Sequence, residues 1–128
     1  MTQVSVEKLR IAADQRGDVF EPLDAAGLQG QQNVHVVWTE PGHVRGNHFH
    51  REGHEVSVVR GPALVRYRED EQLIELNVPA GEAWRFSFPP GVVHAFKNTG
   101  AVAMIIVSFN TAVHDPGKPD TVREVILQ

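Results

Sequence analysis

Four histidines stand at spacings that could bring their side chains onto one metal ion. One residue separates His48 from His50, and alternate side chains of a strand share a face, so both imidazoles face the same side. Imidazole nitrogens bind zinc, iron, nickel, copper or manganese. We therefore predict a site for a divalent metal ion, zinc first, with iron, nickel or manganese as alternatives, and an open coordination position would make it catalytic. The predicted ligands are His48, His50, His54 and His94.

Short strands must position these histidines. Glycine, proline and asparagine recur at short intervals along the chain, and the segments between them are rich in valine, isoleucine, phenylalanine and tryptophan. This pattern is typical of an all-β sandwich or barrel. His54 follows a turn-prone segment and His94 follows Pro89-Pro90-Gly91, so both lie at strand starts. The predicted strands are 32–39, 55–60, 63–68, 73–78, 84–88, 92–96 and 102–109, with one helical turn within 22–31, a coil over 111–120 and a last strand within 122–127.

Composition and charge limit the kinds of partner and the cellular location that we expect for this protein. The chain has 128 residues, which fit one domain, and a net charge of -4, which argues against nucleic acid and anionic membranes as partners. It has no cysteine, so the sequence excludes disulfides and zinc–thiolate sites. The first ten residues lack the apolar region of a signal peptide, and no apolar run reaches membrane-spanning length. We expect a cytoplasmic protein.

The sequence resembles the cupins in two motifs. The first motif is Gly42, five residues, then His48-Phe49-His50; a glutamate usually follows after three or four residues. The three-residue spacing falls on His54, which also fits six residues before Gly61, and the four-residue spacing falls on Glu55. We favour His54 as the third ligand, because strand alternation would turn Glu55 to the other face, and Glu55 remains the alternative.

The second cupin motif is Pro89-Pro90-Gly91 followed by His94 and Asn98, with its leading glycine, Gly81, two residues further away than usual. The resemblance implies a double-stranded β-helix, or jelly-roll, barrel. We expect a single cupin domain over 1–128, with the barrel at about 32–110, N-terminal strands within 4–23 and a C-terminal tail over 111–128.

Two narrower resemblances bear on function. The segments 45–50 and 114–121 are similar to the C-terminal cupin domain of capsular polysaccharide enzymes that act on UDP-linked sugars. Residues 14–17 with Glu21 resemble the nucleotide-side segment of dTDP-4-dehydrorhamnose 3,5-epimerases and dTDP-sugar ketoisomerases, although Val19 stands where an aromatic residue is usual. Together they imply an epimerase or isomerase of a nucleotide-linked 4-keto sugar in polysaccharide biosynthesis.

These resemblances assign roles to further residues. His48 corresponds to the catalytic base of the dTDP-sugar epimerases, a role that conflicts with metal ligation, and we favour ligation. Tyr67 is a candidate proton donor, with a packed strand residue as the alternative. Arg16 and Arg45 are expected to bind the diphosphate of a sugar nucleotide. His35 and His43 are expected to be structural or exposed, and His114 to belong to the tail.

Two other functions fit the same residues. An Fe(II) oxygenase could use the same ligands, and a small-molecule-binding cupin would need no catalysis. We expect a homodimer in each case, because sheet edges need cover. The aromatic stripe Trp84, Phe86 and Phe88 is expected to be core or dimer interface.

Overall fold

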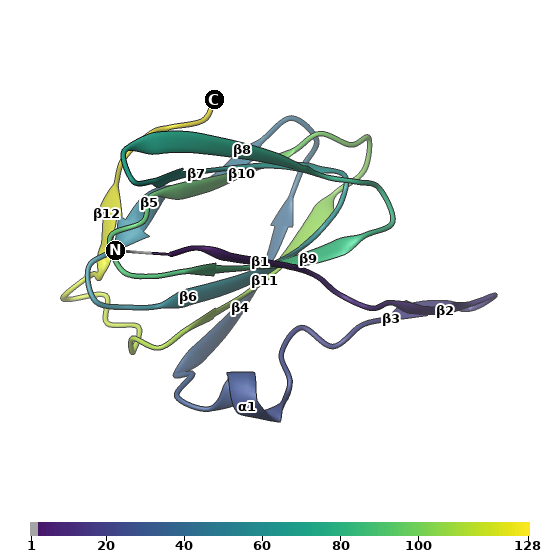
Figure 1. The fold of residues 1–128 in the computed structure, drawn as a ribbon, viewed down its shortest axis with the longest axis horizontal. Coiled ribbons are helices and arrows are strands. Elements are labelled where there is room, and N and C mark those ends of the chain that lie inside the picture. The colour runs from purple at the N-terminus through teal and green to yellow at the C-terminus, as the bar shows by residue number, and fades with distance from the viewer. Residues whose placement is uncertain (1–2) are drawn as a thin grey trace.

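The structure is a computed structural model that describes residues 3–128, and it is built almost entirely of β-strands in two five-stranded antiparallel sheets (Figure 1). One sheet has the order β1 (Ser5–Lys8), β9 (Ala83–Phe88), β6 (Glu55–Arg60), β11 (Met104–Asn110) and β4 (Asn33–Thr39). The other has the order β12 (Thr121–Arg123), β5 (Val44–His50), β10 (His94–Asn98), β7 (Ala63–Glu69) and β8 (Gln72–Val78). The predicted all-β barrel is confirmed.

The core lies between the two sheets because each strand turns alternate apolar side chains inward. Val65 of β7 and Val59 of β6 are fully buried, and Ile106 of β11 is 2% exposed. Burying such side chains contributes about 1.5–3 kcal/mol each. The same alternation turns hydrophilic side chains of β5, β6 and β10 inward at one end of the barrel, where the candidate site lies.

The aromatic stripe of β9 belongs to this core. Phe86 and Phe88 are both buried, and their rings stack with centroids 5.9 Å apart. Trp84 packs against the edge of the same cluster, and its indole N–H donates to Glu82 at 2.9 Å. Of the two expectations for this stripe, core packing is therefore the one that the structure supports.

The N-terminal part adds two small elements outside the barrel. β2 (Ala12–Asp14) and β3 (Gly17–Val19) form a hairpin that projects away from the sheets, and α1 (Ala25–Leu28) follows it (Figure 1). Arg60 donates two hydrogen bonds of 2.7 Å to the carboxylate of Asp18, which ties β3 of the hairpin to β6. The helical turn predicted within 22–31 is confirmed.

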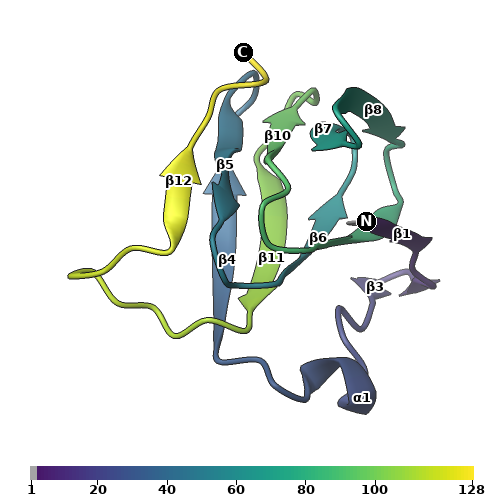
Figure 2. The ribbon, with the colours of Figure 1, turned by 60° about the vertical axis from the view of Figure 1, so that its left-hand side comes forward.

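The C-terminal segment crosses the open end of the barrel. The chain between β11 and β12 contains no regular secondary structure, as predicted for 111–120, and it loops out beside β5 before β12 pairs with that strand (Figure 2). β12 is shorter than the predicted strand within 122–127. Residues after it are held by the side chain of Asn47, which accepts the N–H groups of Ile126 and Leu127 and donates to the Leu127 carbonyl at 3.0 Å. Because a side chain makes these bonds, no strand pattern is needed to order the segment.

Among the helices that the structure describes, none combines the length and the apolar character needed to cross a membrane.

Candidate metal centre

Four side chains from three strands converge at the open end of the barrel. His48 and His50 come from β5, His94 from the neighbouring β10, and Glu55 from β6 of the facing sheet. One nitrogen or oxygen of each lies within 4.8 Å of those of the others. The imidazoles of His48 and His94 pack edge to face with centroids 5.0 Å apart. We call these four side chains the His–Glu group.

A β-bulge in β5 sets the direction of the two histidines on that strand. His48 pairs with His94 but Gly46 pairs with Ala95, so Asn47 is an extra residue in the ladder, with a positive φ of 56°. A Cβ on Gly46 would lie 2.8 Å from the His94 carbonyl oxygen, so only glycine allows this close approach. The bulge bends β5 beside β10, and the His-x-His alternation then turns both rings toward the barrel interior.

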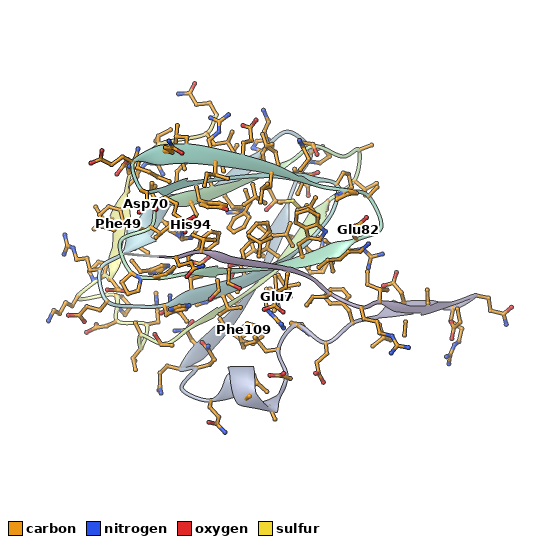
Figure 3. All side chains as sticks on the ribbon, in the orientation of Figure 1. Glu7, Phe49, Asp70, Glu82, His94 and Phe109 are labelled. Carbon is orange, nitrogen blue, oxygen red and sulfur yellow. The ribbon has the colours of Figure 1, made fainter. Side chains whose placement is uncertain are left out.

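His94 is the most buried member, with no exposed surface, and it lies inside the barrel (Figure 3). Its ring stacks on Phe88 with centroids 4.1 Å apart. Nδ1 lies 3.0 Å from the Val92 carbonyl oxygen, which can only accept, so Nδ1 carries a proton and donates it. Nε2 is left to face the other three side chains.

Glu55 is the only anionic member of the group and lies at its centre. Its Oε1 is 2.8 Å from His50 Nε2 and 3.7 Å from His48 Nε2, and its Oε2 is 3.0 Å from His94 Nε2. Ser57 donates to Oε2 at 2.6 Å. Burial opposes ionisation of Glu55, but the charge of His94 and the close nitrogens of His48 and His50 outweigh it and hold its pKa well below the usual 4.5.

The donor set fits a divalent cation. His94 Nε2 is buried and, among residues 3–128, has no hydrogen-bond partner of acceptable geometry, although Glu55 Oε2 lies 3.0 Å away. A nitrogen lone pair and a carboxylate oxygen at this separation repel unless a cation lies between them. A proton on Nε2 meets this need in part: burial lowers the pKa of His94, but Glu55 outweighs it and the net shift is upward. A metal ion would satisfy all four donors at once.

Glu55, and not His54, completes the group. His54 precedes β6 and turns to the other face of the sheet, where its Nε2 lies 2.6 Å from the Ser87 hydroxyl. Glu55 is the first residue of β6 and shares the inward face with Ser57. The expectation that His54 faces the interior and Glu55 the other side of the sheet was therefore wrong, because the odd-numbered side chains of β6 point inward. The four-residue spacing after His50 was the informative signal.

Three members of the His–Glu group line a cavity of about 460 Å³, namely His48, His50 and Glu55, and the buried His94 does not. The walls of this cavity come from β4, β5, β11 and the tail, and several of its polar side chains were not predicted as site residues. His35 of β4 and His114 of the tail both line it, with ring centroids 6.0 Å apart. Their separation of 79 positions hides this proximity in the sequence. The other polar lining residues include Asn33, Arg45, Ser108, Asn110, Asp115 and Asp120.

The remaining predicted site residues divide between the cavity and other places. Arg45 lines the cavity, and its guanidinium donates to the Trp38 carbonyl at 2.9 Å. Tyr67 does not line it: the ring is 5% exposed, belongs to the core cluster and contacts Phe88, so the packed-residue alternative is the one the structure supports. Arg16 lies at the tip of the projecting hairpin, where it pairs with Asp14 at 2.6 Å, away from the cavity.

The two facing sheets, the bulged His-x-His strand and the inward histidine of β10 define a cupin barrel. The chain belongs to the polysaccharide biosynthesis C-terminal domain family, whose model matches residues 12–122. The resemblance to the C-terminal domain of capsular polysaccharide enzymes is thereby confirmed. No curated protein matches the sequence.

Solved structures support the fold. The capsular polysaccharide assembling protein CapF from Staphylococcus aureus is 26% identical over 92% of this chain, with a TM-score of 0.68, and the chain spans 34% of CapF. The 3'-monoepimerase ChmJ from Streptomyces bikiniensis, solved with dTDP, is 18% identical, with a TM-score of 0.71, coverage of 89% of this chain and 66% of ChmJ. The sugar 3,4-ketoisomerase QdtA from Thermoanaerobacterium thermosaccharolyticum, solved with TDP, is 20% identical, with a TM-score of 0.64, coverage of 94% of this chain and 88% of QdtA.

Proposed function

We propose that this chain is a metal-dependent epimerase or isomerase of a nucleotide-linked 4-keto sugar, acting in polysaccharide biosynthesis. The observation that carries the proposal is the His–Glu group at the wall of a cavity large enough for a sugar, in a family of polysaccharide biosynthesis domains. Of the proteins that share the fold, QdtA is a sugar 3,4-ketoisomerase solved with TDP, and ChmJ is a 3'-monoepimerase solved with dTDP and with dTDP-quinovose.

The residues that would hold the metal are His48, His50, Glu55 and His94. A divalent ion held there would act as a Lewis acid on the ketone oxygen of the substrate. Four protein donors fill a tetrahedral site, so an open position requires a coordination number of five or six. In this proposal His48 is a ligand and not the free base, because a nitrogen that binds a metal cannot also accept a proton.

Epimerisation next to a ketone needs one group that removes the α-proton and one that returns a proton to the carbon. His35 and His114 are the candidates, because both line the cavity and an imidazole nitrogen can accept or donate a proton. One ring would accept the α-proton at a nitrogen, and the other ring, when protonated, would return a proton to the same carbon. The tail would thus supply one of the two proton carriers.

The nucleotide would need cations for its diphosphate. Arg45 lines the cavity and can meet such an anion. Arg16 can do so only in the cavity of a second copy, since the hairpin carries it away from its own barrel. The proposal therefore includes a homodimer in which each hairpin reaches its neighbour.

Solvent-exchange experiments test the proposed reaction. The protein is loaded with zinc and incubated in deuterated water with dTDP- and UDP-linked 4-keto-6-deoxy sugars, and mass spectrometry follows deuterium in the sugar. We expect incorporation at the carbon next to the ketone, with Glu55→Gln inactive and His43→Ala, at an exposed histidine outside the cavity, unchanged. No exchange with either nucleotide series would contradict the proposal. Oxygen uptake by the iron-loaded protein would favour the Fe(II) oxygenase in its place.

A further inference from the structure

Asp120 lies beside the His–Glu group without belonging to it. Its Oδ1 accepts the N–H of Glu52 and its Oδ2 accepts the N–H of Gly53, both at 2.9 Å. The same Oδ2 lies 3.4 Å from Nδ1 of His50, on the side of the ring opposite Glu55. Two backbone donors therefore fix this carboxylate next to one predicted ligand.

The turn between β5 and β6 is shaped around this carboxylate. The N–H of Arg51 donates to the Asp120 carbonyl at 2.9 Å, and Thr121 pairs with His50 in the ladder between β12 and β5. A Cβ on Gly53 would lie 2.8 Å from Asp120 Oδ2, so the turn needs glycine at this place. The backbone around Asp120 therefore holds its carboxylate in place, so the side chain is not free to move.

The chemistry of the pair assigns a role to Asp120. An ionised carboxylate only accepts hydrogen bonds, so the His50 nitrogen that faces it must carry the proton. Nε2 also faces a carboxylate, 2.8 Å from Glu55 Oε1, but Glu55 belongs to the His–Glu group and Asp120 does not. A metal ion held by the group would therefore take the place of the proton on Nε2, while Asp120 would still accept from Nδ1. A movement of a few tenths of an ångström would bring Nδ1 and Oδ2 to hydrogen-bond distance. Carboxylates that orient a ligating histidine in this way strengthen metal binding.

We propose that Asp120 is a positioning residue that keeps Nδ1 of His50 protonated and aims Nε2 at the metal, and that it thereby links the tail to the metal centre. The inference rests on the proposed function, since it assumes that the His–Glu group binds a metal. The residues just before Asp120, among them His114 and Pro119, form one wall of the cavity. Because coupling between two binding events is reciprocal, a metal ion would in turn stabilise this wall.

Zinc affinity of the whole chain tests the inference. The dissociation constant is measured by competition with a chromophoric chelator for the wild type, Asp120→Asn and Asp115→Asn. Asp115 is the matched control, because it lies in the same segment and its side chain accepts the N–H of Gly117 at 3.0 Å. We expect Asp120→Asn to weaken zinc binding by about 10–100-fold and Asp115→Asn to leave it unchanged.

A spectroscopic readout separates positioning from a general effect on folding. In proton NMR of the zinc-loaded wild type, we expect a ring N–H resonance of His50 that is protected from solvent exchange, and we expect Asp120→Asn to lose this protection. Equal affinity of the wild type and Asp120→Asn, or no protected resonance in the wild type, would overturn the inference. If Asp120→Asn does not fold, the wild-type resonance decides alone. Failure of the wild type to bind zinc would instead refute the proposed metal centre, and the inference with it.

Discussion

At the scale of single residues, the site is organised by which nitrogen of each histidine is already occupied. The Val92 carbonyl accepts a hydrogen bond from His94 Nδ1–H, so Nε2 faces the group. Asp120 stands in the same relation to His50. Glu55 then supplies the one negative charge that three convergent imidazoles need. These contacts predict that substitutions at neighbouring positions of the site differ in their effect on metal binding.

Removal of His94 should abolish stoichiometric metal binding. His94→Ala deletes the most buried donor of the group and leaves Glu55 with fewer partners, so we also expect a loss of about 3 kcal/mol or more in the free energy of unfolding. Metal content by elemental analysis and urea denaturation measure the two effects. The exposed His43 is the control, and His43→Ala should match the wild type in both. Full metal content in His94→Ala would exclude it as a ligand.

Substitution of Glu55 and of His54, one at a time, should show which of the two is the third metal ligand. Glu55→Gln keeps the shape of the side chain but removes its charge, so we expect it to lose the metal. His54→Gln should keep it, because the His54 ring contacts Ser87 on the other face of the sheet. The metal-to-protein ratio after dialysis gives the answer. Loss of the metal from His54→Gln and its retention in Glu55→Gln would instead identify His54 as the third ligand.

The metal-free protein should have a stability maximum between two titrations. The pKa of Glu55 is held below 4.5 in the fold, so its contribution is present above that pH and is lost as the pH falls through the folded value. The pKa of His94 is raised above 6.5, so its contribution is present below that pH and is lost as the pH rises through the folded value. Urea denaturation of chelator-treated protein across pH should show both limbs. Glu55→Gln should flatten both limbs, and an unchanged profile in that variant would show that the Glu55–His94 pair does not set the pH dependence.

At the scale of elements, turn signals and β-rich segments predicted the strands of the barrel because each strand buries one face. What they missed was the phase of β6 and the bulge of β5. A bulge at Asn47 arises from close approach of β10, a contact that no local pattern encodes. For the same reason, His35 and His114 were not predicted to meet, since the tail reaches the cavity through bonds such as that from Asn33 to the Ala112 carbonyl at 2.7 Å.

The hydrogen bonds from the Asn47 side chain to the C-terminal segment should contribute measurably to the free energy of unfolding. Its amide makes three bonds to the backbone of Ile126 and Leu127, so Asn47→Ala leaves buried polar groups unpaired. We expect a loss of about 2–3 kcal/mol in the free energy of unfolding by urea. Asn77→Ala, at an exposed position of β8, should change it little. Equal stability of the two variants would show that these hydrogen bonds do not contribute to the free energy of unfolding.

At the scale of the whole molecule, β4 is an edge strand with an apolar outer face. Val34, Val36 and Trp38 are 55%, 61% and 57% exposed, and no lysine or proline interrupts the strand. Long apolar edges of this kind pair with other chains unless they are covered. This face supports the proposed homodimer.

A charge placed on β4 should dissociate the homodimer. We expect the wild type to sediment as a dimer and Val36→Lys as a monomer, because a lysine would be buried against the partner. Leu73→Lys is the matched control, since Leu73 is 54% exposed on β8, an edge strand of the other sheet, and this variant should remain a dimer. Sedimentation velocity at several concentrations distinguishes the states. A monomeric wild type would refute both the interface and the proposed reach of Arg16 into a second cavity.

The most direct test of the metal centre is elemental analysis of the protein purified without a histidine tag and without added metal. We expect close to one divalent metal ion per chain, held by His48, His50, Glu55 and His94. A chain that carries no metal, even after incubation with zinc, iron, nickel and manganese salts, would contradict it. That result would leave His48 free to act as the base of a metal-free reaction.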